Sequence, residues 1–376
     1  SLPIAFRLPL SCYTGGLIGL QRQVLLNVLN MIMETSRGLG SVLILWLVSP
    51  TVEAFFLWQA AVSVAHVGLI AFFFWRALPT IAEPPRFRRE LLLNIWRFAA
   101  GMIGINVLVT ILLQEDKIIL SRMLNLELFG YYTLAFTVAA SMSIFASPVF
   151  KATYPRLTNL VTLGSTKELI RLYHESAQLV AVFILPAAII VTLFSKEILL
   201  LWTQNPETAD QTHLLVSILV IGTALNGLMT IPYALQLAFG WTRLALFLNL
   251  VAVLVLVPFL IALTMWYGVV GAASVWVILN VSYLIIGIHF MHRRLLPTEK
   301  WRWYFRDVGL PFGVAVLVAG ILRLIIPIPG NTIALIAFIV MFSTITLGAT
   351  ALATPVTRNW LQAQILDWRV SRKTKS

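Results

Sequence analysis

Charge and cysteine are both scarce in this sequence of 376 residues. Charged residues make up 11% of the chain, against about a quarter in an average soluble domain. The single cysteine, Cys12, excludes a disulfide framework and any zinc or iron–sulfur site built from several cysteines. No long basic run with interleaved aromatic residues stands apart from the apolar segments, so we expect no nucleic-acid partner. The low charge excludes an ordinary soluble domain.

Sequence patterns for catalysis are missing as well. The chain has no Gly-x-x-x-x-Gly-Lys-Ser/Thr loop, which excludes ATP hydrolysis by that route. No stretch between apolar runs is long enough for a glycosyltransferase domain, and no Ser/His/Asp or paired-carboxylate arrangement stands out. We therefore predict a protein that is not an enzyme and that has neither a cofactor nor a metal site.

Long apolar runs dominate what is present, because 59% of the residues are hydrophobic. A bilayer core of about 30 Å requires about 20 apolar residues per helix, whereas barrel strands would be about ten residues long with strict alternation. The sequence therefore predicts an all-α, polytopic membrane protein with about eleven helical spans. Their expected ranges are 3–19, 24–48, 53–75, 93–114, 128–149, 176–194, 212–236, 244–265, 269–288, 308–326 and 332–353.

The loops between these spans alternate in charge. One set is strongly basic and includes the loop with Arg86, Arg88 and Arg89 and the C-terminal tail, while the other set carries acids such as Glu53 and Glu197. Short loops rich in Lys and Arg remain in the cytoplasm. The pattern therefore predicts that the C-terminus is cytoplasmic.

Two helix-to-helix turns resemble each other, at Gly19–Arg22 and at Gly240–Arg243. Transporters are commonly built from repeated halves, in which corresponding turns lie on the same side. If the repeat is real, the second half begins near residue 90, and we expect about three spans to precede Ser1. The alternative is that Gly and Arg are simply common in tight cytoplasmic turns.

Four sequence runs together carry a family resemblance. They are Tyr13–Asn27 (YTGGLIGLQRQVLLN), Asp116–Tyr132 (DKIILSRMLNLELFGYY), Tyr154–Leu160 (YPRLTNL) and Ile198–Thr203 (ILLLWT). In this order they resemble the Wzx-type O-antigen flippases of the polysaccharide-transport branch of the MOP superfamily. The resemblance implies a MATE-like, two-lobed helix bundle with a central cavity and a final helix pair, about fourteen spans of which about eleven are present here.

The resemblance also implies a function and a set of partners. The substrate would be an oligosaccharide on undecaprenyl diphosphate, an O-antigen or exopolysaccharide repeat unit, moved by alternating access from the cytoplasmic to the periplasmic leaflet of the bacterial inner membrane. Besides this lipid-linked oligosaccharide and membrane lipids, the expected partners are a polysaccharide polymerase and a chain-length regulator. The expected segments are the remainder of the first lobe (1–83), an amphipathic cytoplasmic linker (84–92), the second lobe (93–292), the C-terminal helix pair (293–355) and a basic cytoplasmic tail (356–376).

Charged residues within spans are costly unless they are paired or hydrated, so each is a candidate for function. Glu34 and Arg37 are three positions apart on one expected helix and therefore share a face. The planar donors of Arg37 suit a diphosphate; alternatively, the two residues form an internal salt bridge that only locks helices. Arg7, in the first expected span, is a further candidate for substrate binding.

Asp116 and Lys117 follow the span expected over 93–114. If that helix continues to Leu124, both lie within the outer part of the cavity, where Asp116 would carry a coupling proton and Lys117 would bind substrate. If the helix stops at Leu113, they form an ordinary solvated turn. Arg97, near the cytoplasmic mouth, either binds substrate or extends to lipid headgroups.

Two other functions compete with the flippase. A MATE-like, cation-coupled multidrug antiporter would share the fold but needs an anionic cavity, which the cations Arg7 and Arg37 oppose. An integral-membrane polymerase or acyltransferase would need a large catalytic loop, and the segments between spans are short.

Overall fold

The computed structural model describes residues 7–78, 89–356 and 358. Within them the chain is helical without strands, and nine helices are long and apolar enough to cross a membrane. The predicted all-α, polytopic class is therefore confirmed. Contacts divide the chain into two compact units, Ser1–Arg88 and Arg89–Ser376, and each is described below by itself.

Three helices form the first unit: α2 (Arg7–Gly19), α3 (Gln23–Leu47) and α4 (Val52–Ala77). Gln21 has a left-handed backbone (φ 57°) that separates α2 from α3. Thr51 caps α4 by accepting a hydrogen bond from the backbone N–H of Ala54. The small core of this unit contains Leu17, Leu26, Leu29 and Ile70.

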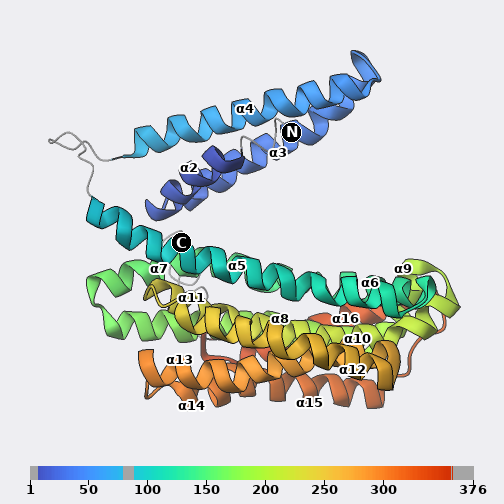
Figure 1. The fold of residues 1–376 in the computed structure, drawn as a ribbon. Coiled ribbons are helices and arrows are strands. Elements are labelled where there is room, and N and C mark those ends of the chain that lie inside the picture. Colours follow the sequence, from blue (N-terminus) through green and yellow to red (C-terminus); the bar gives the residue numbers. More distant parts are fainter. Residues whose placement is uncertain (1–6, 79–88, 357, 359–376) are drawn as a thin grey trace, which may run out of the picture. The chain divides into compact units, whose positions relative to one another are not determined.

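The second unit is a bundle whose long helices run side by side (Figure 1). Its largest core surrounds α8 and α10, and a smaller one joins α8 to the last two helices. Its elements are α5 (Arg89–Met123), α6 (Leu126–Ala140), α7 (Ser143–Leu163), α8 (Thr166–Leu193), α9 (Ser195–Thr203), α10 (Pro206–Leu228), α11 (Thr230–Ala238), α12 (Arg243–Ser282), the π-helix η1 (Tyr283–Gly287), α13 (Ile288–Leu295), α14 (Lys300–Arg302), the π-helix η2 (Trp303–Gly309), α15 (Leu310–Ile325) and α16 (Thr332–Ala353).

Local sequence explains several boundaries. Asn125 accepts from the N–H of Leu128 at the start of α6, and Asn205 caps α10 just before Pro206. Gly164 has a left-handed backbone (φ 69°) and ends α7. Such caps satisfy backbone groups that would otherwise be unpaired at helix ends.

The eleven predicted spans and the nine long helices in the described residues differ at two places in the chain. The structure describes only 13 residues of α2, where 3–19 was predicted. The predicted spans 244–265 and 269–288 lie in one segment, in which two helices meet at Gly268 (φ 60°, ψ −143°). The chain reverses there, because Tyr283 donates to Asn249 at 2.6 Å, while 34 residues of straight helix would span about 50 Å.

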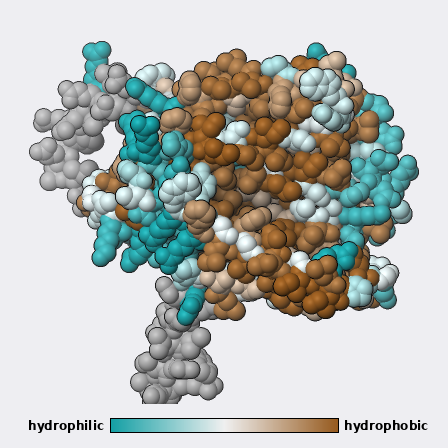
Figure 2. All heavy atoms as spheres, turned by 90° about the horizontal axis from the view of Figure 1, so that it is seen from below, coloured by the Kyte–Doolittle hydropathy of each residue, from teal (hydrophilic) through white to brown (hydrophobic). Residues whose placement is uncertain are grey.

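The surface agrees with a membrane location. Figure 2 shows a broad band of apolar side chains with hydrophilic side chains at both ends. Leu254 on α12 is 67% exposed and Leu317 on α15 is 64% exposed. Large contiguous apolar surfaces are rare on soluble monomers, and a bilayer would cover these side chains.

Candidate functional sites within the spans

The predicted pair of Glu34 and Arg37 forms on α3 in the first unit. The Nη1 of Arg37 lies 3.3 Å from Oε1 of Glu34, and the Arg37 side chain is 30% exposed. The Nε of Arg37 is buried and has no hydrogen-bond partner among the described residues. Glu34 therefore engages one edge of the guanidinium and leaves donor capacity unused.

Polar contacts between α3 and α4 surround this pair. His66 contacts Asn30 through Nε2 and Oδ1 at 3.0 Å, and Gln59 donates to the hydroxyl of Ser41 at 3.0 Å. Ser41 in turn donates to the backbone carbonyl of Arg37. The first two bonds tie α3 to α4 on either side of Arg37 in the sequence.

In the second unit, α5 continues past Leu113 and ends at Met123, which agrees with the longer of the two alternatives for this helix. Asp116 and Lys117 therefore lie within a span and not in a solvated turn. The hydroxyl of Tyr132 on α6 donates to Oδ2 of Asp116, and the Nζ of Lys117 lies 4.0 Å from the centre of the Phe136 ring. Glu115 has a buried carboxylate oxygen without a hydrogen-bond partner among the described residues.

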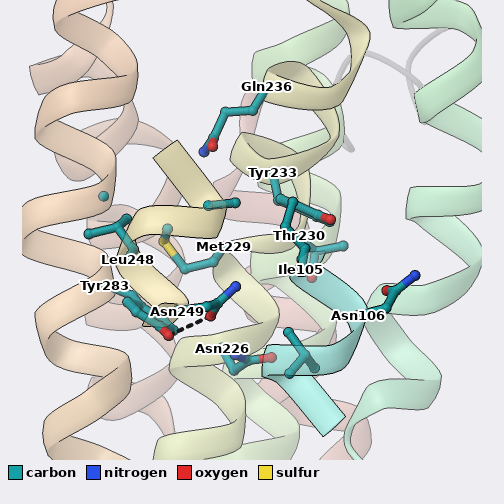
Figure 3. A pocket seen from close by; sticks show the side chains of 13 residues that line it. Ile105, Asn106, Asn226, Met229, Thr230, Tyr233, Gln236, Leu248, Asn249 and Tyr283 are labelled. Carbon is teal, nitrogen blue, oxygen red and sulfur yellow. Dashed lines mark hydrogen bonds between the residues drawn. The ribbon is translucent and has the colours of Figure 1, made fainter. Parts of the chain in front are cut away.

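At the middle of α5, a cavity of about 290 Å³ opens between α5, α10, α11, α12 and η1. Its walls combine amides and hydroxyls with apolar side chains, and Figure 3 shows how they converge. Asn226 donates to Asn280 at 2.8 Å, which ties α10 to α12 at one wall. The lining residues are Ile105, Asn106, Val109, Asn226, Met229, Thr230, Tyr233, Gln236, Ala245, Leu248, Asn249, Tyr283 and Gly287.

Two irregularities of the backbone shape this cavity. The helix breaks at Met229, between α10 and α11, and Pro232 follows, which lacks the N–H needed for a regular helical bond. Tyr283 and Gly287 are the first and last residues of η1. Breaks and π-helical turns are frequent at functional sites. Pro232 was the available signal for the first irregularity, whereas the sequence offered none for the π-helix.

A third polar cluster, which sequence reasoning missed, joins α8 to η2. His174 is 2% exposed and contacts Asp307 through Nδ1 and Glu299 through Nε2, the latter at 2.9 Å. Gln178, one turn further along α8, donates to the other oxygen of Asp307 at 2.8 Å. Partial burial raises the pKa of Glu299, but hydrogen bonds from His174 and Arg302 outweigh it, so the pKa lies below its usual value.

The remaining predicted site residues are Arg7 and Arg97. Arg7 is the first residue of α2, and Arg97 lies in the third turn of α5. Their side chains lie outside the part of the chain that the structure describes. Of the expected linker 84–92, residues 84–88 are also outside it, and residues 89–92 belong to α5.

The fold and these sites define a multi-span helical membrane protein with polar groups inside its spans. Residues 21–205 match the family described as "Polysaccharide biosynthesis protein". The chain is also similar to the "Putative O-antigen transporter" of Shigella flexneri, with 23% identity over 233 residues that cover 59% of this chain and 54% of that protein. It thus spans about half the length of the curated relative it matches. No solved structure matches the chain.

The printed descriptions of the matched family and of the matched transporter agree with the resemblance found in the sequence, which is to the Wzx-type polysaccharide flippases.

Proposed function

We propose that this chain belongs to a flippase that moves an undecaprenyl-diphosphate-linked oligosaccharide from the cytoplasmic to the periplasmic leaflet of the bacterial inner membrane. The observation that carries the proposal is the family match over residues 21–205, supported by the similarity to an O-antigen transporter. The C-terminus would be cytoplasmic. A polysaccharide polymerase and a chain-length regulator would act with the flippase.

Arg37 is the residue best suited to hold the diphosphate. Its guanidinium carries several donors in one plane, and Glu34 engages only one edge of it. A phosphate could therefore bind the unused donors without displacing Glu34. Arg7, Arg97 and Lys117 would add positive charge along the path, offsetting the cost of moving an anion through a low-dielectric region.

Transport without ATP requires another source of energy, and Asp116 is the candidate for coupling. It lies inside a span, where an acid is expensive unless it serves a function. Glu34 is the second acid that we assign to coupling or ion pairing. Alternating access between two lobes is the mechanism that such folds commonly use.

The test of Arg37 uses the full-length protein in cells that lack the native gene. We expect Arg37→Ala to abolish surface polysaccharide and to accumulate lipid-linked oligosaccharide facing the cytoplasm, whereas Arg37→Lys retains part of the activity as a point charge. Arg76→Ala is the matched control, because Arg76 is exposed in the last turn of α4. Normal surface polysaccharide with Arg37→Ala would refute the role of Arg37.

A MATE-like cation antiporter is favoured by one observation, the two acids Glu115 and Asp116 inside α5. Inverted membrane vesicles separate the two functions. Proton- or sodium-driven uptake of ethidium that is lost in Asp116→Asn would support the antiporter. Uptake of a lipid-linked oligosaccharide without ethidium transport would support the flippase.

A further inference from the structure

We propose that the cavity bounded by α5, α10, α11, α12 and η1 binds one uncharged sugar residue of the transported glycan and excludes charged sugars. This proposal rests on the proposed function, because it gives the glycan a binding site within the second unit. It concerns residues that the sequence analysis did not select.

The first argument is the absence of charge. None of the thirteen residues that line the cavity is acidic, basic or a histidine. A diphosphate or an acidic sugar moved into this space would lose hydration and find no counter-ion, which is strongly unfavourable. The cavity is therefore unsuited to the charged part of the substrate.

The second argument is unused hydrogen-bonding capacity. Gln236 is 4% exposed, and its Oε1 has no partner among the described residues. Tyr283 occupies the Oδ1 of Asn249, so the amide nitrogen of Asn249 is turned toward the interior of the cavity (Figure 3). One wall thus offers an acceptor and another a donor, and a sugar hydroxyl can satisfy both kinds of group.

The third argument is an aromatic wall. Tyr233 lines the cavity and stacks on Phe150, with ring centres 6.3 Å apart and planes 15° apart. Phe150 in turn stacks on Tyr154 at 5.6 Å and 9°. The stacking holds the Tyr233 ring in place at the wall of the cavity, and the C–H face of a pyranose can pack against an aromatic side chain.

The volume limits what can bind. At about 290 Å³ the cavity is at the lower end of small-ligand sites, which span about 300–1,000 Å³. It can hold a monosaccharide but not a complete repeat unit. A lipid tail would fit the volume but would leave the buried acceptor of Gln236 unsatisfied, which is costly.

Direct binding tests the proposal. The full-length protein is placed in lipid nanodiscs free of sugar-based detergents, and saturation-transfer NMR is recorded with methyl glucoside, methyl N-acetylglucosaminide and the anionic methyl glucuronide. We expect transfer to one or both uncharged glycosides and none to the glucuronide. Gln236→Leu should weaken this binding about tenfold, since the donating sugar hydroxyl then loses its acceptor.

Two further variants keep the test decisive. Gln236→Glu is nearly isosteric and keeps an acceptor at this position, so it should bind the uncharged glycosides better than Gln236→Leu does and should still exclude the glucuronide. Gln211→Leu is the matched control, because Gln211 is exposed on α10 and does not line the cavity. Thermal unfolding midpoints establish that each variant is folded.

Three results would overturn the proposal: equal binding of the glucuronide, unchanged binding by Gln236→Leu, or no binding of any uncharged glycoside. Failure here is distinguishable from failure of the proposed function. A protein that delivers surface polysaccharide normally but binds no glycoside would contradict only the cavity assignment. A protein that binds glycosides but never supports surface polysaccharide would contradict the flippase.

Discussion

The hydroxyl of Tyr132 on α6 donates a 2.7 Å hydrogen bond to Oδ2 of Asp116 on α5. Tyr132 is 2% exposed, so this bond is shielded from water. It fixes the acid that we assign to coupling and links two helices of the second unit.

Loss of the Tyr132 hydroxyl should destabilise the protein. We expect Tyr132→Phe to cost about 1.5–3 kcal/mol, because the bond involves a carboxylate in a partly buried site. Thermal or denaturant unfolding of the purified protein measures the effect. An unchanged unfolding midpoint would indicate that the bond contributes nothing.

The variant Asp116→Asn distinguishes a role of Asp116 in stability from a role in coupling transport to an ion. An asparagine oxygen can still accept from Tyr132, so we expect a smaller loss of stability than in Tyr132→Phe, together with loss of transport. Surface polysaccharide and the unfolding midpoint are measured on the same variant. A stable Asp116→Asn protein with normal transport would remove Asp116 from the mechanism.

The cluster around His174 predicts that the contact between α8 and η2, which are distant in sequence, contributes strongly to the stability of the protein. His174→Ala leaves Asp307, which is fully buried, with Gln178 as its remaining side-chain partner. An inadequately paired buried charge costs about 3–5 kcal/mol, and we expect a loss of this order. The double variant His174→Phe/Asp307→Leu should recover much of it, because no buried charge remains. If the double variant were less stable than His174→Ala, the charge argument would be wrong.

Glu299 predicts a dependence of stability on pH. Its pKa in the folded protein lies below the usual value of 4.5, so folding favours the ionised form. The contribution of Glu299 is therefore complete above pH 4.5 and is lost as the pH falls through the lowered value. We expect the unfolding midpoint of wild type to exceed that of Glu299→Gln at pH 7, and the difference to shrink below pH 4.5. A constant difference would contradict this assignment.

Substitution of Gly268 should lower the stability of the protein through backbone conformation alone. Its backbone (φ 60°, ψ −143°) is one that L-residues rarely adopt, yet an added Cβ would meet no atom within 4 Å. We expect Gly268→Ala to cost about 1–3 kcal/mol through backbone strain alone. Gly330→Ala is the control, since Gly330 has equal space and no positive φ.

The sequence alone predicted the fold class and the positions of most spans. Unpaired backbone groups and charges are costly in a bilayer, so each span is a long apolar run that can be recognised in the sequence. The pairing of Glu34 with Arg37 could also be anticipated, since it follows from helical spacing. The extension of α5 through Asp116 could not, because a charged stretch reads equally as a turn or as a functional part of a span.

The uncharged cavity and the His174 cluster were missed for physical reasons. Asn, Gln and Tyr are tolerated in many spans, so Gln236 and Asn249 do not stand out in the sequence. His174 and Asp307 are 133 residues apart, and their contact depends on how α8 packs against η2. Such long-range pairings require tertiary structure and leave no local pattern.

The last two long helices are fastened to α8 at two levels. Near one end, His174 contacts Glu299 and Asp307; near the other, Phe194 packs edge-on against Phe338 and Phe342. These contacts hold the segment that leads into α15 at one end of α8 and hold α16 at the other. If the proposed transport cycle rocks this unit, α15 and α16 would move together with α8 and displace the surrounding lipid, so the transport rate would depend on bilayer thickness.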